Sequence, residues 1–141
     1  MDKELALGCM RIGNMNLDEA ETLILEAVNN GITFFDHADI YGNRKCEEIF
    51  GQVLKRNPEL RSKIKIQSKC GICNGYYDLS KDHIIKQTLE SIRLLNCDYL
   101  DVLLLHRPDS LVCYQEVNEA FDYLFKNVLK LYTNEDLKLN I

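Results

Sequence analysis

Short apolar runs alternate along the chain with longer segments in which apolar residues recur every three to four positions. A short apolar run indicates a buried strand, whereas the longer spacing indicates an amphipathic helix. The apolar runs predict strands over residues 5–10, 32–35, 64–69 and 99–105. The helical spacing predicts helices over residues 17–30, 46–56, 81–95 and 116–126. The pattern therefore predicts four successive strand–helix units.

Capping residues mark several of these boundaries. Asn16 precedes the first helical segment, and Glu19 stands three residues later, as in a capping box. Gly31 follows the same segment, where a glycine ends a helix most easily. Ser80 is placed to cap the third helix, and Pro58 lies just past the second.

Strand–helix alternation is typical of an α/β fold with a parallel sheet and right-handed crossovers. An open, doubly wound sheet and a closed barrel both have this pattern. The first turn reads GCMRIGNMN and lacks the G-x-G-x-x-G of a dinucleotide-binding open sheet. We therefore predict part of a TIM-type (β/α)8 barrel, with about four to five units. No repeat or linker marks a boundary, so residues 1–141 are predicted to form a single, incomplete barrel domain.

Polar side chains stand where the predicted strands end. Asp36 follows the second strand, Lys69 closes the third and His106 follows the fourth, while Tyr41 lies in the loop after Asp36. In a β/α barrel these ends meet at one mouth, where the chemistry takes place. Each residue alone would more often have a structural role. The four together predict a site.

These four residue types suit hydride addition to a carbonyl group. A partly buried Lys and Asp should pair, because either charge alone would be costly there. An ammonium stabilises the ionised form of a neighbouring phenol, which favours proton donation. A neutral imidazole can hold the carbonyl oxygen. Tyr41 is thus the candidate acid, with Lys69, Asp36 and His106 as its partners.

Three segments resemble the aldo-keto reductase family: FFDHADIYG (34–42), IQSKCG (66–71) and LLLHRPD (103–109). They are similar to that family's D-x-A-x-x-Y-G, strand-end Lys and L-x-x-H patterns, with the His after the aspartate found in bacterial-type members. The resemblance implies NADP(H) as cofactor, a small carbonyl substrate and catalysis by Asp36, Tyr41, Lys69 and His106. It also implies that Met10 and Arg11 border the nicotinamide ribose.

The resemblance covers residues 5–127. A closed barrel has eight strands, and the C-terminal end, residues 128–141, diverges and lacks the Gly-x-Ser-Asn segment that the resemblance leads us to expect. We therefore expect most of the implied cofactor site to be absent from this sequence. One alternative is a reductase remnant without turnover, or a regulatory or oligomerising fragment. Open sheet edges lead us to expect self-association.

Composition narrows the function classes. The net charge of −5 argues against a nucleic-acid or anionic-membrane partner. No apolar run approaches the ~20 residues of a membrane span, and the N-terminus does not resemble a signal peptide. We therefore expect a cytoplasmic protein whose six cysteines stay reduced.

Two further patterns concern metal and redox chemistry. Cys70 and Cys73 form a lone C-x-x-C without the context of a zinc or thioredoxin-like site. His37, Asp39 and His106 would permit a metal-dependent barrel hydrolase, but further ligands are missing. We predict no metal site.

Overall fold

The computed structural model describes residues 5–128 and contains one parallel sheet with strand order β1-β2-β3-β4. The strands are β1 (Ala6–Gly8), β2 (Phe34–Asp36), β3 (Lys65–Cys70) and β4 (Val102–Leu105). The helices are η1 (Cys9–Asn14), α1 (Leu17–Asn29), α2 (Lys45–Arg56), η2 (Pro58–Leu60), α3 (Lys81–Leu94) and α4 (Tyr114–Asn127), of which η1 and η2 are 3₁₀ helices. Four β/α units are therefore present, as predicted. The predicted fifth unit and residues 129–141 lie outside the described part.

Local sequence explains both ends of α1. The Asn16 side chain accepts a hydrogen bond of 2.9 Å from the Glu19 N–H, and the Glu19 carboxylate accepts one of 3.0 Å from the Asn16 N–H. This is the predicted capping box. Gly31 has a φ of +83°, and the Ile32 N–H returns to the Ala27 carbonyl. A left-handed residue at this position favours glycine, so Gly31 ends the helix as predicted.

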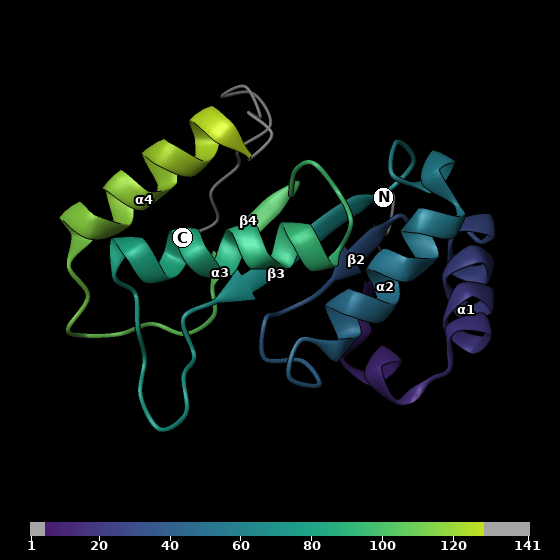
Figure 1. The fold of residues 1–141 in the computed structure, drawn as a ribbon, viewed down its shortest axis with the longest axis horizontal. Helices are drawn as coiled ribbons and strands as arrows, with labels where there is room; N and C mark the ends of the chain where they lie inside the picture. Colours follow the sequence, from purple (N-terminus) through teal and green to yellow (C-terminus); the bar gives the residue numbers. More distant parts are fainter. Residues whose placement is uncertain (1–4, 129–141) are drawn as a thin grey trace.

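In the part of the chain that the structure describes, the sheet has one covered face and one open face. Phe35 packs against Phe50 of α2 with ring centroids 5.2 Å apart, and Leu103 is buried on the same side. Figure 1 shows α2 and α3 in front of the strands, with α1 next to α2 at the right-hand end. Because side chains alternate along a strand, their neighbours project from the other face. There Leu104 is 40% exposed and pairs in register with Lys69.

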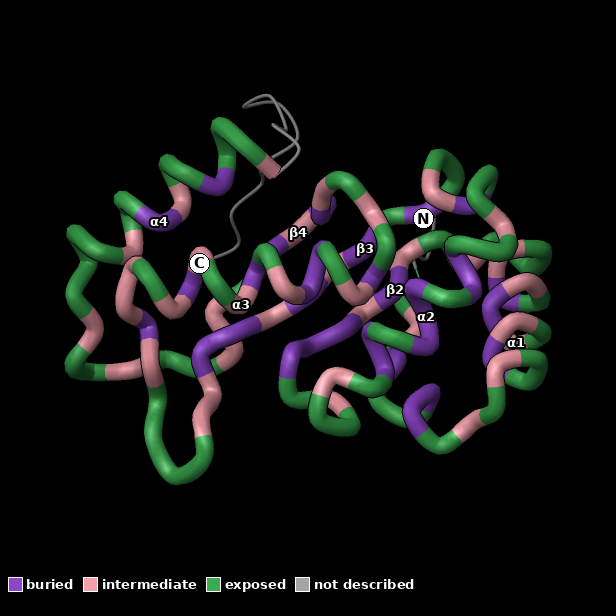
Figure 2. Tube along the Cα trace, viewed as in Figure 1, coloured by how far each residue is buried: buried purple, intermediate pink, exposed green. Residues whose placement is uncertain are grey.

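The buried residues lie mainly between the covered face of the sheet and the helices α1–α3. Figure 2 shows buried residues along the strands and on the sides of α1–α3 that face them. In α4 only Ala120 and Leu124 are buried. The helices α2 and α3 approach closely at Gly51, where a Cβ would lie 1.9 Å from the Leu94 carbonyl oxygen. Only glycine permits this contact.

Three predictions of local structure were wrong. The strand predicted over residues 5–10 ends at Gly8, because Cys9 and Ile12 turn inward on η1 and are buried there. The Ser80 side chain makes no cap hydrogen bond; instead, its N–H donates to Asp78. The strand predicted from residue 99 begins at Val102, because the Ile66 N–H donates to the Asp101 side chain at 2.9 Å instead of to a backbone carbonyl.

The described helices differ in length and polarity from membrane spans. Within residues 5–128, none is both long enough and apolar enough to cross a bilayer.

Candidate active site

Lys69 is the centre of the predicted site. Its ammonium lies 2.7 Å from Asp36 Oδ1, 2.8 Å from the His37 carbonyl oxygen and 3.1 Å from the Tyr41 hydroxyl. A lysine ammonium has three donors and no acceptor. Each donor therefore has one partner, and the side chain is held in a single position. The predicted ion pair between Lys69 and Asp36 is confirmed.

The parallel ladder brings these residues together. Asp36 pairs in register with Gln67, two residues before Lys69 on the same side of β3. Beyond the strand ends the backbone pairing continues, because the Asp39 N–H donates to the Lys69 carbonyl at 3.0 Å. The His106 N–H donates to the Cys70 carbonyl at 2.9 Å on the other side. Three consecutive units thus deliver their polar side chains to one edge of the sheet.

His106 stands beside the phenol. Its ring lies edge-on to the Tyr41 ring, with centroids 6.1 Å apart. Partial burial lowers the pKa of His106 below its ordinary value, and the nearby cations Lys69 and Arg107 lower it further. The imidazole is therefore neutral near neutral pH. Asp36, Tyr41, Lys69 and His106 converge as predicted.

We did not identify two further groups of the cluster from the sequence. Gln67 donates a short hydrogen bond to Asp36 Oδ1, and the His37 carbonyl accepts from Lys69. The alternation of side chains along β3 places Gln67 on the same face as Lys69, so this neighbour was recognisable. A backbone carbonyl leaves no such signal.

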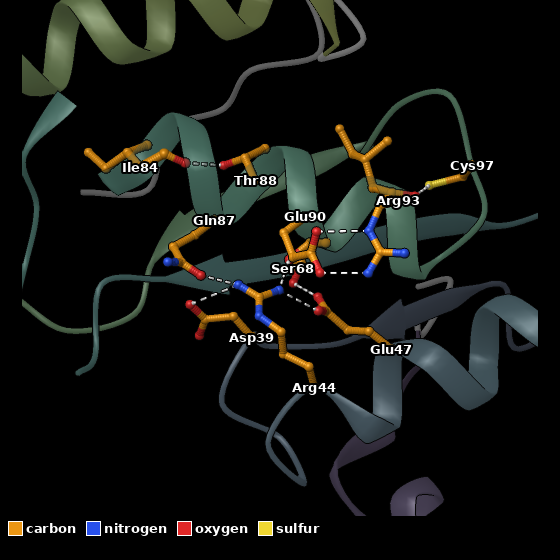
Figure 3. Close-up of polar contacts among 12 residues, drawn as sticks. Asp39, Arg44, Glu47, Ser68, Ile84, Gln87, Thr88, Glu90, Arg93 and Cys97 are labelled. Atoms are coloured by element: carbon orange, nitrogen blue, oxygen red, sulfur yellow. Dashed lines mark hydrogen bonds and ion pairs between the residues drawn. The ribbon is translucent and has the colours of Figure 1, made fainter. Parts of the chain in front are cut away.

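A buried network anchors the loop that carries Tyr41. Arg44 immediately precedes α2 and has a left-handed φ of +70°. Figure 3 shows its guanidinium between Asp39, Glu47 and Gln87. It lies 3.1 Å from Glu47 Oε2, and Glu47 Oε1 accepts a hydrogen bond of 2.7 Å from Ser68. The arginine satisfies a fully buried carboxylate and ties the loop after β2 to β3 and α3.

The remaining candidates are placed as follows. Met10 and Arg11 lie exposed on η1, next to the end of β1, and their contact with a cofactor stays a prediction. His37 is fully buried, with its ring 4.5 Å from Phe50 on the helix-covered side of the sheet. Burial lowers the pKa of His37 to about 3. Its ring thus lies on the opposite face from His106, and no group of three potential metal ligands is clustered among residues 5–128.

Comparisons with known proteins identify the family of this chain. The model of the aldo/keto reductase family matches residues 4–127. The chain is 43% identical to the oxidoreductase YdhF of Escherichia coli over 122 residues, which are 81% of this chain and 41% of YdhF. It is 41% identical to the uncharacterized oxidoreductase YcsN of Bacillus subtilis, over 83% of this chain and 43% of YcsN. A third relative, 37% identical over 85% of this chain and 45% of its own length, is the 6-dehydroglucose reductase of Agrobacterium fabrum.

Solved structures show the same likeness. The aldo-keto reductase AKR11C1 of Bacillus halodurans, in its holo form, superposes with a TM-score of 0.79 at 30% identity. That match covers 92% of this chain and 44% of the other. The chain thus spans less than half the length of the curated relatives named above. Within that span, the chain belongs to the aldo/keto reductase family.

Proposed function

We propose that the protein takes part in NADPH-dependent reduction of an aldehyde or ketone, with Tyr41 as the general acid. One observation carries the proposal. Lys69 donates its third hydrogen bond to the Tyr41 oxygen, 3.1 Å away. Because the ammonium cannot accept a hydrogen bond, the Tyr41 oxygen is the acceptor, and the phenol proton is left to be donated to a substrate oxygen.

Lys69 and Asp36 prepare this transfer. As the proton leaves, negative charge develops on the phenol oxygen, and the adjacent ammonium stabilises it. Asp36, 2.7 Å from Lys69, holds the ammonium in place and balances its charge. The substrate carbonyl gains the proton at its oxygen, and a reduced nicotinamide, when bound, supplies hydride to its carbon.

His106 is proposed to orient the substrate. A neutral imidazole carries one N–H, which can donate to the carbonyl oxygen beside the Tyr41 hydroxyl. Burial and the neighbouring cations keep the pKa of His106 low, so the ring donates without adding a positive charge. The edge-on packing of the Tyr41 and His106 rings directs both side chains to one small region.

The open face leaves room for a cofactor beside this cluster. Gly8 ends β1 in register with Asp36, and a Cβ built on it would meet no atom within 4 Å. A flat ring can therefore approach the strand end next to Asp36. Met10 and Arg11, on η1 immediately after Gly8, are the residues proposed to border the nicotinamide ribose.

The substrate is proposed to be a small carbonyl compound. The relative named 6-dehydroglucose reductase makes oxidised sugars one class to test. We expect the protein to act in the reducing cytoplasm, since its six cysteines are free thiols.

A second candidate is a reductase remnant that retains the site but has no turnover. The observation that favours it is coverage, because the chain matches only 41–45% of the length of the three curated relatives named above. An assay of the full chain with NADPH and para-nitrobenzaldehyde separates the two. Loss of the reduced-nicotinamide absorbance with formation of the alcohol supports the reductase. Tight cofactor binding without alcohol formation would support the remnant.

A further inference from the structure

A second group of reactive side chains lies away from the Lys69 cluster, in the loop between β3 and α3. The Cys73 sulfur is 3.7 Å from Nε2 of His83. On the other side of the ring, Nδ1 of His83 is 3.4 Å from Oδ2 of Asp78. A thiol, an imidazole and a carboxylate in this order form the arrangement that activates a cysteine nucleophile, often with looser contacts when no substrate is bound.

Local structure holds the three side chains in place. The loop folds back on itself through a bridge between Ile72 and Tyr77, and the Cys73 N–H donates to the Tyr76 carbonyl at 2.9 Å. Asp78 Oδ1 accepts the Ser80 N–H at 3.0 Å. Hydrogen bonds from Ser80 hold the pKa of Asp78 below its usual range. The ionised carboxylate, 3.4 Å from Nδ1, favours the tautomer with its proton on Nδ1, and this tautomer leaves the Nε2 lone pair on the side of the thiol.

The site opens into a hollow of about 410 Å³. The residues that line it include Cys73 and His83, together with Asp39, Arg44 and Gln87. Figure 3 shows these last three side chains gathered between α2 and α3. A small molecule can therefore reach the sulfur, which is only half-buried.

We infer that Cys73, His83 and Asp78 form a reactive-thiol site that is modified by low-molecular-weight disulfides. The thiol proton passes to Nε2 of His83, and the Cys73 sulfur attacks one sulfur of the disulfide. A new S–S bond forms as the old one breaks, and the leaving thiolate takes the proton from the imidazolium. One thiol and one disulfide give one mixed disulfide and one thiol, with no further oxidant or reductant.

Cys70 and Cys113 differ from Cys73 in burial and in the groups that their thiols contact. Cys70, the first cysteine of the C-x-x-C, is buried on β3, and burial raises its pKa to about 12. It cannot readily act as a resolving thiol, so the mixed disulfide on Cys73 should persist. Cys113 is exposed, and its thiol contacts the Gln115 side chain rather than a histidine. If accessibility alone set the rate of reaction with a disulfide, Cys113 would react faster than Cys73. If His83 activates the Cys73 thiol, Cys73 reacts faster.

The test uses the full chain and limiting dithiobis(nitrobenzoic acid), with the modified cysteine identified by peptide mass spectrometry. Cys73 should react at least about tenfold faster than Cys113. His83→Gln should remove this advantage, and Asp78→Asn should reduce it, while the Cys113 rate stays unchanged in both. Because Cys70 becomes reactive only if the fold opens, its protection reports on folding in each variant.

Two results would overturn the inference. One is preferential modification of Cys113 in the unaltered chain. The other is a Cys73 rate that neither substitution changes. If Cys70 becomes reactive in His83→Gln, the fold of that variant has opened. The Cys73 rate in Asp78→Asn is then the test, and an unchanged rate would overturn the inference. The reductase proposal does not depend on any of these rates, because Cys73 lies outside the Lys69 cluster.

Discussion

The hydrogen bond of 3.1 Å from Lys69 to the Tyr41 oxygen joins two residues that are 28 positions apart in the sequence. Lys69 gives its other two protons to Asp36 and to the His37 carbonyl. The direction of the bond is therefore determined, and Tyr41 keeps its own proton for another acceptor. This relationship supports the proposed proton donor more strongly than proximity alone.

The first prediction concerns the charge on His106. Lys69→Met should raise the pKa of His106, because it removes a cation that disfavours the protonated ring and leaves Asp36 unpaired nearby. Titration of the His106 ring by NMR measures this directly. Lys65→Met, at the far end of the same strand, is the matched control and should change little. An unchanged His106 pKa in Lys69→Met would contradict the described cluster.

The second prediction concerns acid stability. Burial keeps His37 neutral in the folded protein and lowers its pKa from 6.5 to about 3. As pH falls below 6.5, the unfolded chain gains a proton that the folded chain does not. The free energy of unfolding should therefore fall between pH 6.5 and 3, by an amount on the order of several kcal/mol.

His37→Leu should weaken this dependence, as measured by urea unfolding at several pH values. At pH 8, where the ring is neutral in both states, the two proteins should differ only by the effect of the substitution on packing. An equally steep loss of stability in His37→Leu would show that another group is responsible.

The third prediction tests the contact between α2 and α3. Gly51→Ala places a Cβ 1.9 Å from the Leu94 carbonyl oxygen, so the helices must separate. We expect a loss of about 1–3 kcal/mol or more in the free energy of unfolding. Gly8→Ala is the control, since its Cβ would meet no atom within 4 Å and should cost less than about 1 kcal/mol. Similar unfolding midpoints for the two variants would contradict the described packing.

The fourth prediction concerns self-association, which we propose for the open face of the sheet. The edge strands β1 and β4 each pair on one side only within the described sheet, and Leu104 is 40% exposed on the open face. Sedimentation velocity should show association that rises with concentration and weakens in Leu104→Gln. Leu111→Gln is the control, because Leu111 is 90% exposed but lies in a loop. A concentration-independent monomer would contradict this proposal.

The repeated strand–helix pattern predicted the order of the units because each helix has a local apolar face and most ends carry a local signal. The boundaries that were wrong depend on tertiary contacts. Asp101 replaces a ladder hydrogen bond through its side chain, and Cys9 turns into the core on η1. Neither event has a signature in the surrounding residues.

The site was predictable for a similar reason. A parallel sheet brings strand ends to one edge, so Asp36, Lys69 and His106 could be placed together without coordinates. The Arg44 network could not be predicted in this way. Its partners come from two later elements, and its left-handed φ is unusual for arginine. The histidine that meets Cys73 lies ten residues farther along the chain, and only the fold-back of the intervening loop brings them together.

The central claim is that Tyr41 donates the proton. The direct measurement compares the rate of para-nitrobenzaldehyde reduction by NADPH in the unaltered chain, in Tyr41→Phe and in Tyr123→Phe, whose ring lies half-exposed on α4. The account predicts turnover that falls at least about 100-fold in Tyr41→Phe and is unchanged in Tyr123→Phe. A rate that survives the loss of the Tyr41 hydroxyl would contradict it.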